Sequence, residues 1–266
     1  MPDQPITIER REAIEIVSLN RPDRLNAMNA ALIGALKDYF EALHERPEIR
    51  VVLLRGEGRA FCAGLDMTDG AWPRGDEGRV HRGWKTQRSI ATVMQLMRSC
   101  PQPVIALGHG PACGGGFSLL LSSDVRYAAP DIRMNAAYIK IGLGGCDMGS
   151  SYFLPRLVGA SVASEYLLSG KFMTAGKALA CGLVSEIVEP GALLDRGMAL
   201  AEEMLLTAPM GLRMTKDAIN RNIDANGLAE AMAIEDRQQV MLAMTEDHGE
   251  AVSAFLEKRT PRFGDR

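Results

Sequence analysis

The stretch GPACGGGFSLLLSSD, from Gly110 to Asp124, places three consecutive glycines where an apolar run of helical character begins. Glycine is costlier than alanine at this position because its backbone loses more conformational freedom on folding. A group pressed against the backbone would explain the choice, since the first turn of a helix offers unpaired N–H groups and a partial positive charge. The stretch therefore predicts an anion- or oxyanion-binding turn, or else a tight connection between a strand and a helix.

A second glycine turn lies in FCAGLDM, from Phe61 to Met67. It follows RVVLLRG, whose β-branched and leucine side chains between polar flanks predict a buried strand. Two such turns on neighbouring loops would supply a pair of N–H donors for one oxygen atom. The spacing fits neither GxxxxGK[ST] nor GxGxxG, so a nucleotide site has no specific support.

The remaining patterns predict an α/β protein with a layered body. Residues 6–20 alternate apolar and polar side chains around the charged break ERRE, which indicates a pair of strands joined by a turn. A helix capped by Asn29 should follow, because apolar side chains recur at helical spacing up to Leu43. Further strands are expected in PVIALGHG, DVRYAA and LVSEIVE, with a helix near Gln87 to Arg98.

From about Ala192 onward the pattern is helical only, in four segments that begin with LLDRGMALAEEMLL and end with EDHGEAVSAFLEKR. We therefore divide the chain into a core of residues 1–195, which should hold the site, and a helical region of residues 196–266. The Met- and Leu-rich faces of this region need a packing partner, which could be another subunit or the protein's own core.

The composition excludes several classes of protein. The 266 residues carry 30 basic and 33 acidic side chains, a formal charge of −3, so no general field attracts nucleic acid or an anionic membrane. No apolar run approaches the roughly 18 to 20 residues that span a bilayer, and the N-terminus lacks a basic flank leading into an apolar stretch. We expect a cytoplasmic protein that binds neither nucleic acid nor membrane.

Cysteine and histidine give no sign of a metal site. The five cysteines include no CxxC pair and are odd in number, which argues against both a zinc knuckle and a disulfide framework. The four histidines show no HxxxH pattern, and no Cys–His pair suggests a nucleophilic thiol.

Six stretches, in order along nearly the whole chain, carry a family resemblance: NRPDRLNAMN, GRAFCAGLD, GPACGGGFSLLLSSD, GSSYFLPRLVG, TAGKALACGLVSEIV and FLEKRTPRF. Together they resemble the crotonase, or enoyl-CoA hydratase/isomerase, superfamily. The resemblance implies a spiral of β-β-α units, a C-terminal helical region that builds trimers or paired trimers, and acyl-coenzyme A thioester substrates. It also implies an oxyanion hole made by the backbone N–H groups of Leu65 and Gly115, and no cofactor beyond the coenzyme A of the substrate.

The chain departs from the well-known hydratases of this superfamily, which handle water with two glutamates. The corresponding positions hold Ser118 and Tyr138. Serine is no base at neutral pH without a partner, and tyrosine has a reference pKa near 10. A two-glutamate hydration mechanism is therefore not expected.

The loop GLGGCDMGSSYFLPR, from Gly142 to Arg156, offers Asp147 instead. The resemblance implies that this residue matches the catalytic aspartate of dienoyl-CoA isomerases and of the ring-epoxide isomerases of phenylacetate degradation, although the loop before it is one residue longer here. Apolar neighbours could raise its pKa by desolvation. Asp66 and Asp69 are the alternatives, whereas Asp124 is expected to be structural.

For the coenzyme, the resemblance implies that Arg24 lies near the ADP phosphates and that Phe255 and Lys258 reach in from a neighbouring subunit. Guanidinium suits phosphate because of its planar fork. The further predicted substrate contacts are Ala63, Asp66, Ser118 and Tyr138. The segment of residues 69–87 resembles the acyl-pocket region, where Trp72, Trp84 and His81 could line the acyl group.

The sequence therefore predicts an acyl-CoA enzyme that stabilises a thioester enolate, with isomerisation by Asp147 as the leading hypothesis. Hydration, hydrolysis and C–C cleavage remain alternative reactions. A non-catalytic acyl-CoA-binding protein is the alternative from another class, because both glutamate positions lack an acid.

Overall fold

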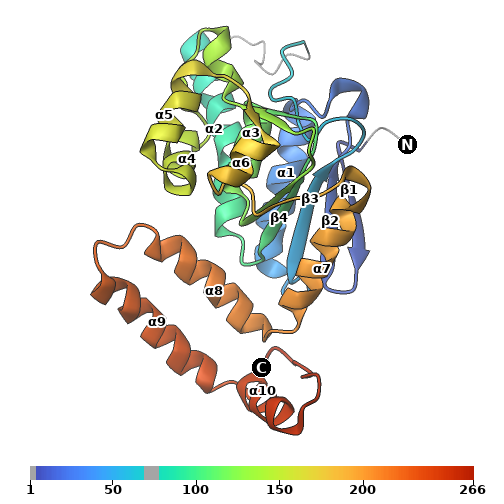
Figure 1. The fold of residues 1–266 in the computed structure, drawn as a ribbon, viewed down its shortest axis with the longest axis vertical. Coiled ribbons are helices and arrows are strands. Elements are labelled where there is room, and N and C mark those ends of the chain that lie inside the picture. Colours follow the sequence, from blue (N-terminus) through green and yellow to red (C-terminus); the bar gives the residue numbers. More distant parts are fainter. Residues whose placement is uncertain (1–3, 69–77) are drawn as a thin grey trace.

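The chain begins with the predicted β-hairpin, in which β1 (Ile6–Arg11) pairs antiparallel with β2 (Ile14–Leu19). Figure 1 shows the computed structural model, which describes residues 4–68 and 78–266. The sheet runs β1-β2-β3-β4-β6-β9, and every pair after the hairpin is parallel. Its later strands are β3 (Val51–Gly56), β4 (Val104–Gly108), β6 (Val125–Ala128) and β9 (Glu186–Ile187).

A smaller sheet, which the sequence did not predict, lies beside the first. It joins β5 (Pro111–Cys113), β7 (Arg133–Asn135) and β8 (Met173–Thr174). Strands of two or three residues are too short for a period of two to be seen in the sequence. They matter here because β5 leads directly into the glycine turn at the start of α3 (Gly115–Ser122).

The large sheet buries both of its faces, as the alternation within β3 shows. Val52 and Leu54 belong to the main core, together with side chains of α1 (Ala30–Ala42) and α2 (Arg79–Ser99). Val51 and Leu53 belong to a second cluster, which α7 (Leu193–Leu205) covers. The boundary predicted between the core (residues 1–195) and the helical region (residues 196–266) falls inside α7.

The N-terminal ends of α1 and α2 can be compared with the sequence prediction. The side chain of Asn29 caps α1 by accepting a hydrogen bond from the backbone N–H of Leu32 at 3.0 Å, as predicted. The prediction for α2 was too short, because the helix begins at Arg79 rather than near Gln87. The first buried side chain of α2 is Thr86, so its opening turns lack the apolar spacing that would reveal them.

The loop that carries Asp147 connects the 3₁₀ helix η3 (Ala137–Ile141) to α4 (Ser150–Val158). Two further helices, α5 (Ala160–Ser169) and α6 (Ala175–Ala180), complete the body before α7. None of the described helices is long and apolar enough to cross a membrane.

Three helices leave the body of the fold: α8 (Pro209–Asn222), α9 (Leu228–Ala243) and α10 (Glu246–Glu257). In Figure 1, α8 and α9 run side by side below the body, and α10 lies beyond them. Large apolar side chains on these helices are exposed in the single chain, among them Ile219, Leu228, Met232, Val240, Met241, Phe255 and Leu256. Assembly through these faces remains a prediction.

Candidate active site

The first glycine turn presents the backbone N–H of Leu65. Gly64 has a φ of +100°, and a Cβ there would lie 2.8 Å from the carbonyl oxygen of Cys113, so the position requires glycine. The neighbouring backbone groups are paired: Met28 N–H donates to Gly64 at 2.7 Å, and Asp66 N–H donates to Met28 at 3.0 Å. The Leu65 N–H has no acceptor among residues 4–68 and 78–266.

The second turn presents the N–H of Gly115, the first residue of α3. Gly114 has a φ of +50°, and its N–H donates to Asn135 at 2.9 Å. A Cβ at Gly116 would overlap the backbone of Cys62, so close packing of the two turns accounts for one of the three glycines. In the described part of the chain the Gly115 N–H has no acceptor, as expected for the first turn of a helix.

Both turns open on one cavity of about 170 Å³. It is lined by five residues predicted from the sequence: Ala63, Leu65, Gly115, Tyr138 and Asp147. The remaining described lining residues are Met28, Gly64, Met67, Gln87, Ile90, Gly114, Ala137, Ile141, Leu143 and Met148. A mainly apolar cavity, lined by two residues whose N–H groups have no acceptor in the described chain and by one carboxylate, suits the stabilisation of charge that develops on an oxygen atom.

Asp147 is half-buried, and its two carboxylate oxygens have different surroundings. Oδ1 accepts hydrogen bonds from the side-chain amide of Gln87 and from the N–H of Met148, the latter at 2.7 Å. Oδ2 has no hydrogen-bond partner among the described residues. Burial raises the pKa of Asp147, while the bonds from Gln87 and Met148 lower it. A carboxylate of raised pKa with one open oxygen can accept and return a proton.

The side chains at the two hydratase glutamate positions are buried and neutral. The Ser118 and Tyr138 hydroxyl oxygens lack a hydrogen-bond partner within the described residues. Burial raises the pKa of Tyr138 to about 12, and the neighbouring Ser150 and Ser118 hydroxyls oppose that rise without forming well-aligned hydrogen bonds to it. Neither side chain is charged at neutral pH. Ser118 lies behind the cavity wall rather than in it.

Several predicted residues lie away from the cavity. Asp66 is buried and forms an ion pair with Arg21 at 3.0 Å, and its other oxygen accepts bonds from Thr68, so it holds the turn rather than lining the cavity. The exposed Trp84 and His81 are likewise absent from the cavity wall. Asp69 and Trp72 lie outside the described residues.

The predicted coenzyme residues are on the surface of this chain. Arg24 is exposed in the 3₁₀ turn Pro22–Arg24. The side chain of Phe255 is 82% exposed, and Lys258 ends α10. The single chain does not bring the last two to its own cavity, and their place in a neighbouring subunit's site remains a prediction.

The sequence analysis included Gln87 as the last residue of the acyl-pocket segment but did not single it out as a site residue, although its spacing carried a signal. It lies three residues before Ile90, so both point from the same face of α2 toward the cavity that they line. Recognition of the buried stripe of α2 would have placed this amide on the face of the helix that lines the cavity.

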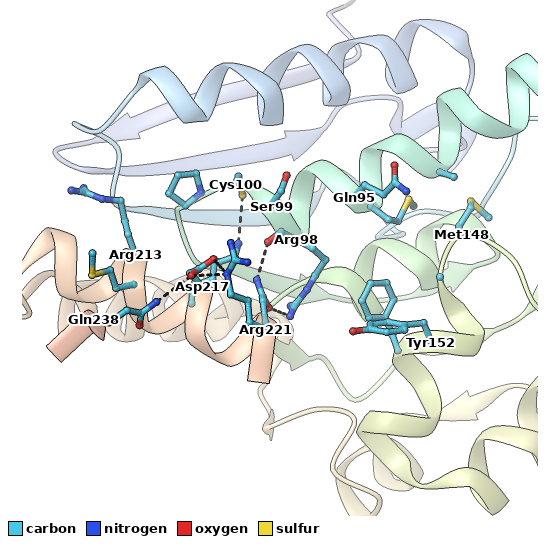
Figure 2. A pocket seen from close by; sticks show the side chains of 18 residues that line it. Gln95, Arg98, Ser99, Cys100, Met148, Tyr152, Arg213, Asp217, Arg221 and Gln238 are labelled. Carbon is cyan, nitrogen blue, oxygen red and sulfur yellow. Dashed lines mark hydrogen bonds and ion pairs between the residues drawn. The ribbon is translucent and has the colours of Figure 1, made fainter. Parts of the chain in front are cut away.

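A larger groove of about 900 Å³ lies between α2, α4 and α8, and Met148 is among its lining residues (Figure 2). Its floor is a polar cluster that attaches α8 to the body. Lys216 is buried, forms an ion pair with Asp124 at 2.9 Å, and donates to the carbonyls of Met97 and Gln102. Arg98 bonds both Asp124 and Asn220. Asp124 thus has the structural surroundings predicted for it.

The fold and the family match that follows together define an acyl-CoA enzyme. Residues 9–266 match the family described as enoyl-CoA hydratase/isomerase. The chain belongs to this family.

Individual relatives agree on the family and differ in their named reaction. A Mycobacterium leprae protein named probable enoyl-CoA hydratase is 37% identical over 94% of this chain and 86% of its own length. The 1,2-epoxyphenylacetyl-CoA isomerase of Escherichia coli K12 is 32% identical over 95% of each chain. The crystal structure of an enoyl-CoA hydratase from Bacillus anthracis superposes with a TM-score of 0.93 at 30% identity, covering 99% of this chain and 100% of that one.

Proposed function

We propose that the protein moves a double bond within the acyl group of a coenzyme A thioester, with Asp147 transferring the proton. The observation that carries this proposal is the placement of Asp147, with Oδ2 unbonded among the described residues, in the same small cavity as the N–H groups of Leu65 and Gly115.

In this mechanism the thioester carbonyl oxygen accepts hydrogen bonds from both N–H groups. Asp147 removes a proton from the carbon next to the carbonyl, and the C–H electron pair moves into a dienolate whose charge rests on the bonded oxygen. The protonated Asp147 returns the proton to the far carbon of the conjugated system, which shifts the double bond. No atom is gained or lost. One preorganised donor to such an oxygen contributes about 10²- to 10³-fold in rate.

Hydration is the second candidate, favoured by the hydratase name of the M. leprae relative. It needs groups that position water and move its protons. The two positions used for this in the hydratases hold Tyr138, which lines the cavity, and Ser118, which lies behind its wall, and neither neutral hydroxyl can act as a base near pH 7. Isomerisation needs one proton-transferring group, and Asp147 supplies it.

We further propose that Arg24 binds the coenzyme phosphates, that Phe255 and Lys258 complete the site from a neighbouring subunit of a trimer or paired trimers, and that no further cofactor takes part. The exposure of Arg24 and Phe255 leaves both accessible for these contacts. Calorimetry of coenzyme A with Arg24→Ala tests the first assignment, and light scattering at micromolar concentration tests the assembly. Unchanged affinity, or a monomer, would remove the respective assignment.

The reaction is tested with a panel of enoyl-, dienoyl- and 3-hydroxyacyl-CoA substrates, followed by thioester absorbance and by mass. Isomerisation leaves the mass unchanged, hydration adds one water, hydrolysis frees coenzyme A, and a binding protein turns over nothing. Products of unchanged mass are expected. Water addition as the fastest reaction would replace the proposal with hydration.

A further inference from the structure

Asp147 is bonded to an element far from it in the sequence. Gln87, on α2, is half-buried, and its side-chain Nε2 donates to Oδ1 of Asp147. The second donor to Oδ1 is the N–H of Met148, the adjacent residue in the same loop. These two bonds occupy one oxygen and leave Oδ2 without a partner in the described chain.

The two donors constrain the carboxylate differently. The terminal torsion of aspartate is broad and roughly two-fold, so packing alone does not decide which oxygen faces a ligand. The Met148 N–H belongs to the residue next to Asp147, so this bond ties the carboxylate only to its own stretch of backbone. The bond from Gln87 ties it to a different element, α2, which is anchored in the main core through Ile90 and Val93.

We infer that Gln87 is a positioning residue, whose amide holds Oδ1 of Asp147 and thereby directs Oδ2 to the acyl group in the cavity. This inference rests on the proposed function of Asp147 as the proton-transferring group. The amide is suited to the task because it is uncharged at every pH and donates to the carboxylate without competing for the proton.

The groups around Asp147 set the expected pH dependence. Tyr138 faces it from η3 and stays protonated at neutral pH, because burial raises its pKa to about 12. Gln87 faces it from α2, and Cys146, Met148 and Ser150 belong to its own turn, where the Ser150 hydroxyl accepts from the Asp147 N–H at 3.0 Å. Removal of the Gln87 donor should raise the pKa of Asp147, since a bond to the ionised form is lost.

The test compares Gln87→Met, which keeps the length of the side chain and removes the donor, with Gln95→Met. Gln95 lies on the same helix and lines the larger groove rather than the cavity. In Gln87→Met, kcat should fall about tenfold to a hundredfold, the loss typical of one hydrogen bond to a charged group. The acidic limb of kcat/KM should move to higher pH because Asp147 must be ionised to act, and KM should change little. Gln95→Met should match the parent.

Two further variants separate positioning from a general structural role. Gln87→Met added to Asp147→Asn should cause no additional loss of kcat, because the amide acts only through the carboxylate. Gln87→Glu keeps the shape but places a second carboxyl beside Asp147, so it should move the acidic limb to higher pH than Gln87→Met does. If circular dichroism shows that Gln87→Met does not fold, Gln87→Glu tests the positioning role in its place.

The outcomes distinguish the inference from the function on which it rests. If Asp147→Asn is inactive while Gln87→Met keeps the parental kcat and pH profile, the positioning role is wrong and the proposed function stands. If Asp147→Asn retains near-parental turnover, both are wrong. An additive loss in the double variant would assign Gln87 a role independent of Asp147.

Discussion

Two partly buried aspartates of this protein differ in how their oxygens are bonded. Both oxygens of Asp124 are occupied: Oδ1 by Arg98 at 2.9 Å, and Oδ2 by the Val104 N–H at 2.8 Å and by Lys216 at 2.9 Å. Asp147 has two donors on one oxygen and none on the other among the described residues. A fully bonded carboxylate holds elements together, whereas one with an open oxygen beside a cavity remains available to a ligand.

The groups around Asp124 and Asp147 also differ in how fully they are hydrogen-bonded. Around Asp124, buried Lys216 is surrounded by oxygens, and the cluster fixes α8 against the end of α2. Around Asp147, the Leu65 and Gly115 N–H groups and the Ser118 and Tyr138 hydroxyls lack protein partners in the described chain. Unpaired buried polar groups cost stability, so the Leu65 and Gly115 N–H groups and the Tyr138 hydroxyl at one cavity favour a site built for a ligand. Unpaired side-chain atoms also occur elsewhere in the described chain, including Gln102 Oε1 next to Lys216.

The largest expected effect is on catalysis by Asp147→Asn. The amide keeps the shape and loses the basicity, so kcat should fall by roughly 10²- to 10⁴-fold, the range typical of general acid–base catalysis, while acyl-CoA affinity changes little. Steady-state kinetics on the best substrate of the panel measures it, with binding followed by calorimetry. Asp217→Asn, at an exposed pair with Arg221, is the control and should keep parental turnover. Near-parental kcat in Asp147→Asn would place Asp147 with the purely structural carboxylates.

Asp124→Asn should lower the stability of the protein and leave its kcat unchanged, which is the reverse of the effect expected for Asp147→Asn. The substitution leaves Lys216, whose side chain is 5% exposed, without its counter-charge, and breaking such a buried pair costs about 3 kcal/mol or more. Urea unfolding at fixed protein concentration should show that loss, with kcat of the folded enzyme near the parental value. Asp217→Asn again serves as the control, because exposed pairs contribute about 0.5 kcal/mol or less. Equal stability of the two variants would contradict the assigned role of the Asp124–Lys216 pair.

The sequence predicted the parts of this molecule that depend on local pattern or on family motifs. Periodicity predicted the hairpin and the strands at Val51–Gly56 and Val104–Gly108, and the motifs placed Leu65, Gly115 and Asp147 at one cavity. It could not show which aspartate oxygens are occupied. The bond from Gln87 to Asp147 crosses 60 residues, and the ion pair that binds Asp66 to Arg21 crosses 45. Such pairings follow from tertiary packing, and no local spacing encodes them.

A smaller effect is expected from Asp147 on the pH dependence of the protein's stability. Burial raises the pKa of Asp147, so between its unfolded and folded pKa values the native state binds more protons than the unfolded state. Stability therefore declines as pH rises through that window, and Asp147→Asn should abolish the decline. Thermal unfolding should give equal stability for parent and variant at low pH and a small advantage for the variant at neutral pH. A variant less stable at neutral pH would mean that the ionised carboxylate strengthens the fold, as Asp124 does.

The smallest effects should come from deleting the two buried hydroxyls. Ser118→Ala and Tyr138→Phe each remove an oxygen that has no hydrogen-bond partner in the described structure, so the folded state loses no such bond. Removal of an unsatisfied buried hydroxyl should therefore leave the free energy of unfolding unchanged or raise it slightly. Isomerisation requires neither hydroxyl, so kcat should change about threefold or less, far less than for Asp147→Asn. Kinetics and urea unfolding on both single variants and their combination measure this.

A loss of kcat in Tyr138→Phe comparable with that in Asp147→Asn would show that the hydroxyl takes part in the chemistry. The cavity would then have two proton-handling groups, which is the arrangement that hydration requires.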